Sequence, residues 1–126
     1  MPNTPSLLGE GATGCFAKPS LPLQLKNSVD KILGSVSKSV VWVEDEVLIN
    51  AVTAVSGSGP AYFFLLVELI AKQGESLGLP RDVALKLASQ TCLGAGRMLC
   101  NPENIDSPEE LRRKVTSPNG TTDAAI

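Results

Sequence analysis

Histidine is absent from the 126 residues, and this absence removes several kinds of chemistry at once. Without it the chain lacks the usual general base, the commonest metal ligand and any Ser-His or Cys-His nucleophile pair. The three cysteines, Cys15, Cys92 and Cys100, form no C-x-x-C motif. An odd number of cysteines without metal-ligand spacing is typical of reduced thiols in a cytosolic protein, so we interpret these three as apolar packing residues.

The chain also has little net charge and no recognisable targeting segment. Its N-terminus has no basic region followed by an apolar stretch, so no signal peptide is predicted. A net charge of -2 gives no basis for binding nucleic acid or a membrane surface. The acidic residues 44–46 have no partner at metal-ligand spacing, so we expect a solvated turn and no metal site.

The first 46 residues have the pattern of a strand, a helix and a second strand. Two prolines within 1–5 exclude a helix there and favour an extended segment or a turn. A short strand is predicted around 13–17, an amphipathic helix over 23–36 and a β-branched, aromatic strand over 40–43. Because so few strands cannot form a stable sheet alone, this part resembles the end of an α/β domain.

The remaining residues are predicted to be helical. A helix over 47–55 is followed by a long helix that begins at Pro60 and ends near Gly78. The next helix begins after Pro80, and its Gly94 and Gly96 predict a close approach by a neighbouring helix. A further short helix begins at a capping box, formed by Ser107 as the N-cap, Pro108 and Glu110.

The helix from Pro60 is unusual because only Glu68 is charged between residues 61 and 71. A helix that is apolar all round is buried in a core, an interface or a membrane. This apolar run is too short to span a bilayer and is interrupted by Glu68. A chain of this size can hardly surround the helix alone, so we expect a partner chain to cover part of it.

Two segments have the composition of a binding site. The turn at 116–123 offers backbone N–H groups and hydroxyls at a helix start, which suits a carboxylate or phosphate. Plain helix capping by serine and threonine explains the same residues more simply. The Ser-Gly-Ser-Gly segment at 56–59 resembles part of a phosphate loop, and a tight turn between packed helices is the simpler interpretation.

Five motifs occur in an order that resembles one enzyme family. They are MPNTP at 1–5, GEGATG at 9–14, VWVE at 41–44, AVTAVSGSGPAY at 51–62 and VTSPNGTT at 115–122. Together they resemble pyrroline-5-carboxylate reductase, and the resemblance covers the whole chain. Its last two motifs are specific in combination.

The resemblance implies a fold class and a domain organisation. Members of this family are about twice as long, with an N-terminal Rossmann domain and a C-terminal helical domain that interlocks with a second subunit. On this basis the chain is mainly α. Residues 1–46 are the end of the NAD(P)-binding Rossmann domain, and residues 47–126 are a helical dimerisation and substrate-loop domain, shortened at its C-terminus. The helical part is expected to resemble the C-terminal domain of 6-phosphogluconate dehydrogenase.

The resemblance also implies an activity, a cofactor and a set of residues. The family transfers a hydride from NADPH or NADH to the C=N bond of 1-pyrroline-5-carboxylate, giving L-proline in the last step of proline biosynthesis. Substrate contacts are carried over to Val115, Ser117, Gly120, Thr121 and Thr122. Thr122 matches the proposed proton donor to the imine nitrogen. Cofactor contacts are carried over to Asn3, Ser56 and Lys114. A cytoplasmic homodimer, or a higher oligomer, is implied, with no nucleic acid or membrane as partner.

Two departures keep other interpretations open. Asn119 stands where the family usually has glycine, although asparagine tolerates positive φ better than most residues. The dinucleotide half is expected to be missing, because we identify no G-x-G-x-x-G motif and no strand pair to carry one, so this chain alone is expected to be inactive. A catalytically inactive helical oligomerisation module is the alternative function. A related dehydrogenase for a different small acid is disfavoured by the 115–122 motif.

Overall fold

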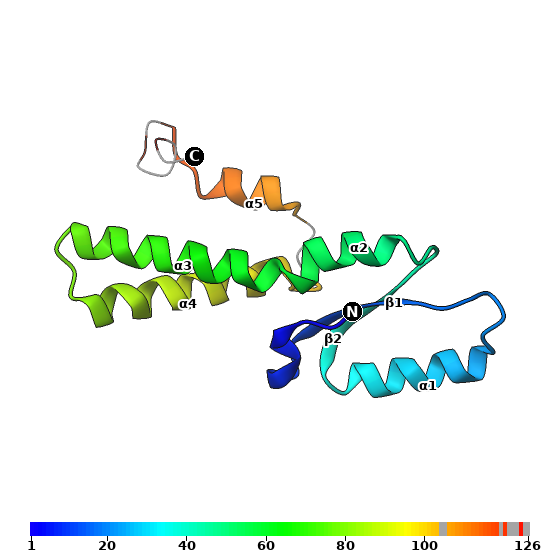
Figure 1. Ribbon diagram of the computed structural model, residues 1–126. Coiled ribbons are helices and arrows are strands. Elements are labelled where there is room, and N and C mark those ends of the chain that lie inside the picture. Colours follow the sequence, from blue (N-terminus) through cyan, green and yellow to red (C-terminus); the bar gives the residue numbers. More distant parts are fainter. Residues whose placement is uncertain (104–105, 119, 121–123, 125–126) are drawn as a thin grey trace. The chain divides into compact units, whose positions relative to one another are not determined.

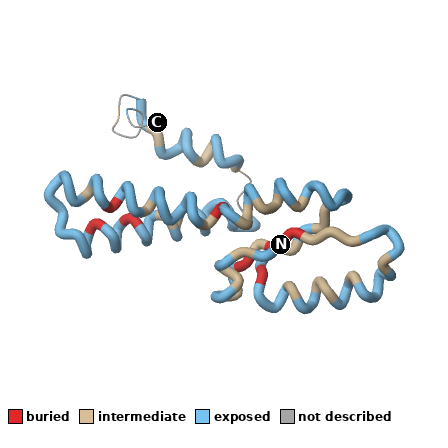
Figure 2. Tube along the Cα trace, in the orientation of Figure 1, coloured by how far each residue is buried: buried red, intermediate tan, exposed pale blue. Residues whose placement is uncertain are grey.

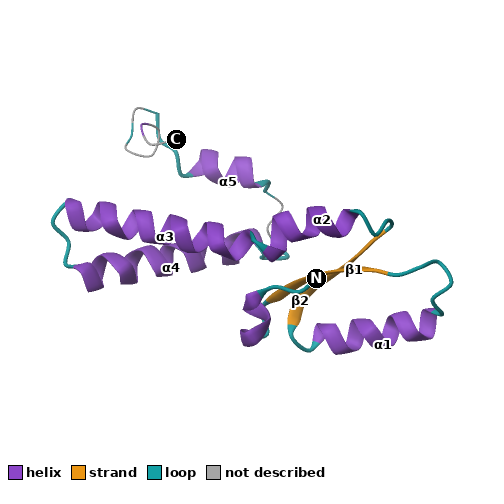
Figure 3. Cartoon of the chain, viewed as in Figure 1, coloured by secondary structure: helices purple, strands orange, loops and turns teal. Residues whose placement is uncertain are grey.

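The computed structural model describes the chain except for residues 104–105, 119, 121–123 and 125–126. The described elements are η1 (Thr4–Leu8), β1 (Gly11–Phe16), α1 (Leu23–Gly34), β2 (Ser37–Val43), α2 (Leu48–Val52), η2 (Thr53–Gly57), α3 (Gly59–Ser76), α4 (Arg81–Leu99) and α5 (Pro108–Lys114) (Figure 1). The chain divides into two compact units, Met1–Leu66 and Val67–Ile126. Helices dominate and the described sheet is small (Figure 3), which confirms the predicted fold class.

Strands β1 and β2 form a parallel pair connected through α1. A tight turn reverses the direction of the chain and so joins antiparallel strands. Parallel strands need a longer crossover connection, which α1 provides here. Gly14 lies opposite Val41, and Phe16 lies opposite Val43. The predicted order of strand, helix and strand is therefore confirmed, although β1 begins at Gly11 and β2 at Ser37, earlier than the sequence indicated.

The single tryptophan attaches α1 to the sheet. Trp42, on β2, donates a hydrogen bond from Nε1 to the Asp30 carboxylate at 2.7 Å. The Lys26 ammonium lies 4.5 Å from the centroid of the same ring, within the range of a cation–π interaction. Because Lys26 and Asp30 are four residues apart on α1, one side chain of β2 contacts two successive turns of that helix.

The N-terminal segment differs from the prediction. The two prolines indicated an extended segment or turn, whereas Thr4–Leu8 is a 3-10 helix with a proline in its first turn. That prediction was wrong because proline lacks only an N–H group that the first turn of a helix leaves unpaired anyway. Gly9 ends the helix in the left-handed region, at φ 72°.

Helices α2, η2 and α3 follow one another over Leu48–Ser76. The middle element is a π-helix, and the Ser58 N–H donates to the Thr53 carbonyl five residues earlier at 2.8 Å. Both helices were predicted, but the π-helix was not. The whole stretch is long and apolar enough to cross a membrane by length and composition alone, and the shorter apolar run at 61–71 is only part of it. Core helices of soluble proteins pass the same test.

In the second unit, α4 packs against the later part of α3 through small side chains. Ala71, Ala84 and Ala88 are buried there, with Val67 packed against them. A methyl group at Gly94 or Gly96 would meet no described atom within 4 Å, so the predicted close approach by another helix does not occur within this chain. The capping box of Ser107 and Glu110 is confirmed, with both reciprocal hydrogen bonds present.

The large apolar side chains of α3 are exposed in this single chain, as the mostly pale trace of this helix shows in Figure 2. Tyr62, Phe63 and Phe64 are 61%, 58% and 66% exposed. Leu69 and Ile70 are also exposed. Such a cluster of exposed aromatic and aliphatic residues is typical of a surface that binds another protein.

Candidate functional site

The predicted substrate turn follows α5, whose ends are well defined. The Ser107 hydroxyl accepts a hydrogen bond from the Glu110 N–H, and the Glu110 carboxylate accepts one from the Ser107 N–H at 2.7 Å. The bond from the Ser107 N–H lowers the pKa of Glu110, because it stabilises the ionised carboxylate, and the Ser107 side chain lowers it further. At the other end, the Thr116 hydroxyl donates to the Arg112 carbonyl at 2.8 Å. The capping interactions therefore set where the following segment leaves the helix.

Within the turn, the described residues are only part of the predicted site. The Gly120 N–H donates to the Ser117 carbonyl at 2.9 Å, so this N–H closes the turn and is not directed to an anion. The Ala124 N–H donates to the Gly120 carbonyl at 3.1 Å, which is the spacing of a helical turn. Thr121 and Thr122, together with Asn119, lie outside the described residues.

The other predicted residues of this region are exposed. Val115 is 65% exposed, and Ser117 is also exposed. Lys114 forms an ion pair with Asp106, with 2.6 Å between Nζ and the carboxylate oxygen. An exposed pair of this kind contributes little to stability, so Lys114 can exchange Asp106 for another anion at small cost.

The two other predicted cofactor residues, Asn3 and Ser56, lie together in the first unit. The Asn3 side-chain amide donates to the Ser56 carbonyl at 3.1 Å, and its oxygen accepts from the Ala12 N–H at 2.9 Å. The Ser56 hydroxyl donates to the Val52 carbonyl at 3.0 Å. Both residues are partly buried, and their polar atoms are directed to protein groups.

Gly9, Gly11 and Gly14 have the G-x-G-x-x-G spacing of a dinucleotide-binding turn, so the expectation that this motif is absent was wrong. The structure places the last two within strand β1. A methyl group at Gly11 would overlap the Ser6 and Ser37 hydroxyls, and one at Gly14 would overlap Val52. These glycines therefore permit close packing, and they do not open a helix toward a phosphate.

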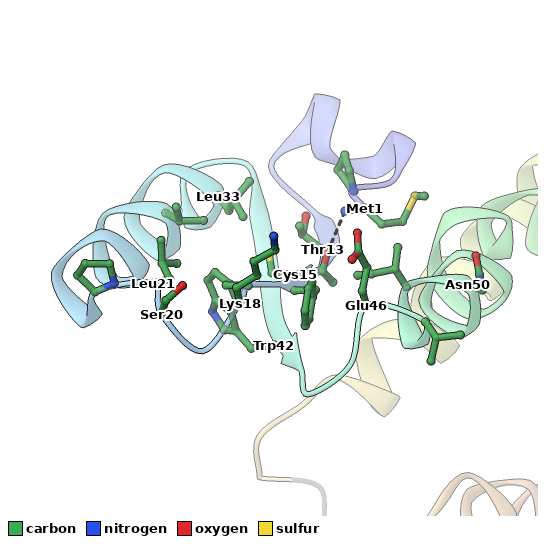
Figure 4. A pocket seen from close by; sticks show the side chains of 18 residues that line it. Met1, Thr13, Cys15, Lys18, Ser20, Leu21, Leu33, Trp42, Glu46 and Asn50 are labelled. Carbon is green, nitrogen blue, oxygen red and sulfur yellow. Dashed lines mark hydrogen bonds between the residues drawn. The ribbon is translucent and has the colours of Figure 1, made fainter.

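A large open cavity of about 1210 Å³ lies in the first unit (Figure 4). Met1, Thr13, Cys15, Lys18, Trp42 and Glu46 are among the residues that line it. Burial raises the pKa of the Cys15 thiol, which keeps it protonated and unreactive at neutral pH. Sequence reasoning did not single out Lys18, and it considered Glu46 only as part of the acidic turn at 44–46. Nothing in their spacing indicates that the two share a cavity. None of the described residues forms a group that could hold a metal ion.

Comparison with known proteins gives a consistent result. A family model described as "Pyrroline-5-carboxylate reductase dimerisation" matches residues 46–126. The chain is 51% identical over 126 residues to a pyrroline-5-carboxylate reductase of Pseudomonas aeruginosa, covering 100% of this chain and 45% of that relative. It is 41% identical over 126 residues to one from Pisum sativum, again covering 100% of this chain and 45% of the relative. The chain thus spans about half the length of the curated relatives it matches.

Solved structures agree. The chain superposes on a pyrroline-5-carboxylate reductase of Coxiella burnetii with a TM-score of 0.92 and 46% identity, covering 100% of this chain and 46% of that one. A Plasmodium falciparum pyrroline carboxylate reductase with NADP bound gives a TM-score of 0.82 at 30% identity, covering 99% and 50%. The match of the family model over residues 46–126 shows that the chain belongs to the pyrroline-5-carboxylate reductase dimerisation family.

Proposed function

We propose that this chain is part of a pyrroline-5-carboxylate reductase, which reduces the C=N bond of 1-pyrroline-5-carboxylate to give L-proline. The observation that carries the proposal is the similarity of all 126 residues to relatives of that name, at up to 51% identity among those described above. The relatives are oxidoreductases by name, and one solved relative holds NADP. The same cofactor class, NADPH or NADH, is proposed for the complete protein.

The substrate is proposed to bind at the turn after α5. Its carboxylate would be held by the Ser117 and Thr121 hydroxyls and by the N–H groups around Gly120 that do not close the turn. Val115, exposed beside them, offers an apolar contact to the ring. The position of Ser117 and Val115 directly after a capped helix supports this assignment, since the cap limits where the turn can lie.

The chemistry needs one proton in addition to the hydride. When the C=N bond is reduced, its carbon gains a hydride and its nitrogen gains a proton, so a donor must lie beside the nitrogen. In a chain without histidine, a positioned hydroxyl can pass that proton from solvent. We assign this role to Thr122. Thr122→Val keeps the side-chain shape and removes the hydroxyl, whereas Thr122→Ser keeps the hydroxyl.

The residues described do not form a dinucleotide site by themselves. The space beside Gly11 and Gly14 is occupied by other protein atoms. The Asn3 amide is hydrogen-bonded to protein groups, and Lys114 is paired with Asp106. Asn3, Ser56 and Lys114 are therefore proposed as contacts at the edge of the cofactor, whose main binding half must come from other residues. A nicotinamide supplies the hydride when it is bound.

We further propose that the helical residues form a homodimer. The exposed aromatic and aliphatic side chains of α3 and the dimerisation description of the matching family support this. Ser56, Gly57 and Ser58 lie within the apolar stretch Leu48–Ser76, and Asn3 binds this region. These polar contacts favour a protein partner over a bilayer, so a cytoplasmic location remains the prediction.

A second candidate function is a non-catalytic dimerisation module. It is favoured by the family match, which covers only the part described as dimerisation, and by the lack of a dinucleotide site among the described residues. It predicts self-association without turnover in any context.

One experiment separates the two candidates. The 126 residues would replace the matching segment of the Pseudomonas aeruginosa relative, and NADPH oxidation would be followed with 1-pyrroline-5-carboxylate. Activity in the chimaera, its loss by about 100-fold in Thr122→Val and its retention in Thr122→Ser would support the reductase. An inactive chimaera that still dimerises would refute the reductase and favour the module.

A further inference from the structure

The carbonyl group of Ser56 lies where the π-helix η2 meets α3, so the hydrogen-bond pattern changes at this point. In an α-helix this oxygen would accept from the N–H four residues later, at position 60. Position 60 is proline, which has no N–H. The N–H five residues later, on Ala61, donates to the Ser58 carbonyl at 3.0 Å instead. Pro60 therefore leaves a gap in the hydrogen-bond pattern of a partly buried turn.

The Asn3 side chain fills this gap from a segment 53 residues away in the sequence. Its Nδ2 donates to the Ser56 carbonyl at 3.1 Å, and its Oδ1 accepts from the Ala12 N–H at 2.9 Å. The side chain thus joins the beginning of strand β1 to the π-helical turn. Met1 packs beside the same turn, since a methyl group at Gly57 would lie 3.4 Å from the Met1 sulfur.

We infer that Asn3 is a positioning residue that supplies the donor missing at Pro60 and holds the Ser56 turn against β1. Only a side chain that donates and accepts at once can make both bonds, and among short side chains a primary amide does this with fixed geometry. Aspartate has nearly the same shape, but when ionised it only accepts. It would keep the bond from the Ala12 N–H and place a carboxylate oxygen against the Ser56 carbonyl.

The consequence for catalysis rests on the proposed function, in which Ser56 lies at the edge of the cofactor. Asn3 would then act through Ser56, by fixing the turn, and need not touch the cofactor. π-helical turns within α-helices are frequent at functional sites, so a side chain that fixes this turn would act on the geometry of the reaction.

Amide hydrogen exchange in the 126-residue chain tests the structural half. Asn3→Asp is expected to speed exchange at the Gly57 and Ser58 amides roughly tenfold, the effect of losing one partly buried hydrogen bond. Asn27→Asp makes the same charge change on the exposed surface of α1 and should leave these amides unchanged. Pro60→Ala restores a backbone N–H, so in that background Asn3→Asp should have much less effect.

An equal effect of Asn3→Asp in both backgrounds, or no effect in either, would overturn the inference. If Asn3→Asp does not fold, the hydrogen bond from Asn3 to Ser56 can still be tested in the unmodified chain. The Asn3 side-chain amide protons should exchange more slowly than those of Asn27, and equal rates would contradict the hydrogen bond to Ser56.

The chimaeric reductase tests the catalytic half. There Asn3→Asp should lower kcat several-fold, Asn27→Asp should not, and adding Pro60→Ala should restore part of the loss. Recovery on the second substitution would tie the loss of kcat to the missing donor at Ser56 and not to the charge at position 3. An inactive parent chimaera would refute the proposed function while leaving the exchange result valid, so the two failures are distinguishable. An active chimaera in which Asn3→Asp leaves kcat unchanged would overturn the catalytic role of Asn3.

Discussion

Self-association should depend on Phe64. This side chain is 66% exposed on α3, so Phe64→Ala removes few contacts within the chain. Alanine is also the better helix former, which keeps α3 intact. Fully burying a phenylalanine contributes about 1.5–3 kcal/mol, so covering the exposed two-thirds would contribute about 1–2 kcal/mol in each subunit. A symmetric dimer contains the residue twice, and its loss should weaken the dimer by about 3 kcal/mol.

That free energy corresponds to roughly a hundredfold rise in the dissociation constant. Analytical ultracentrifugation over a range of protein concentrations would measure it, with circular dichroism to confirm that helix content is unchanged. Leu8→Ala is a matched control, because Leu8 is 84% exposed on η1, outside the residues 46–126 that match the dimerisation family. An unchanged dissociation constant for Phe64→Ala, or an equal weakening by Leu8→Ala, would refute the reasoning.

Three further predictions concern single residues. Gly14→Ala should lower the free energy of unfolding by about 1–3 kcal/mol, because the added methyl group overpacks against Val52. Gly34 has open space around it, so Gly34→Ala should not have this effect. Chemical denaturation of both variants would measure the difference. Cys15, whose pKa is raised by burial, should react more slowly with iodoacetamide at pH 8 than the exposed Cys100, and equal rates by mass spectrometry would contradict this. Because the pKa of Glu110 is lowered in the folded chain, its support of α5 should be present above about pH 4.3 and lost as the pH falls through the lower folded value. NMR should show this titration at the capping box, and Glu110→Gln should abolish it.

The regular elements were predictable because their signals are local. The apolar period over 23–36 predicted α1, and the Ser107 capping box predicted the first residue of α5. Proline and glycine marked the boundary between α3 and α4, where Pro80 is the N-cap and Gly78 has φ 100°. Such signals depend on residues within a few positions of each other, so the element boundaries can be predicted without knowledge of the tertiary structure.

The irregular elements were not predictable for the same reason. The π-helix at Thr53–Gly57 is contacted by Asn3, which is distant in sequence, and no local pattern indicates that contact. The 3-10 helix at Thr4–Leu8 was missed because proline was treated as a helix breaker at a position where it is tolerated. The G-x-G-x-x-G spacing at 9–14 shows the opposite problem, since a motif was present but its structural context was a strand.

The candidate site was only partly accessible to this reasoning. Residues 115–122 were selected by resemblance, and the structure describes Val115, Ser117 and Gly120 but not the two threonines. The engagement of the Gly120 N–H within the turn could not be read from the sequence, because it depends on the backbone conformation between Ser117 and Gly120. Asn3 and Ser56 were both selected as cofactor contacts by resemblance, and their direct hydrogen bond suggests a different division of roles between them.

The distribution of burial is the strongest physical argument for a second copy of the chain. The buried hydrophobic residues in the described part are Ala71, Ala84 and Ala88, while the large side chains of α3 are exposed. Burying three methyl groups contributes about 2–3 kcal/mol, which is no more than the cost of ordering two or three residues. A helical pair packed only through alanines is therefore a weak unit. Covering the exposed aromatic and aliphatic side chains would stabilise this fold, and in the proposed homodimer a symmetric copy would offer the same surface in return.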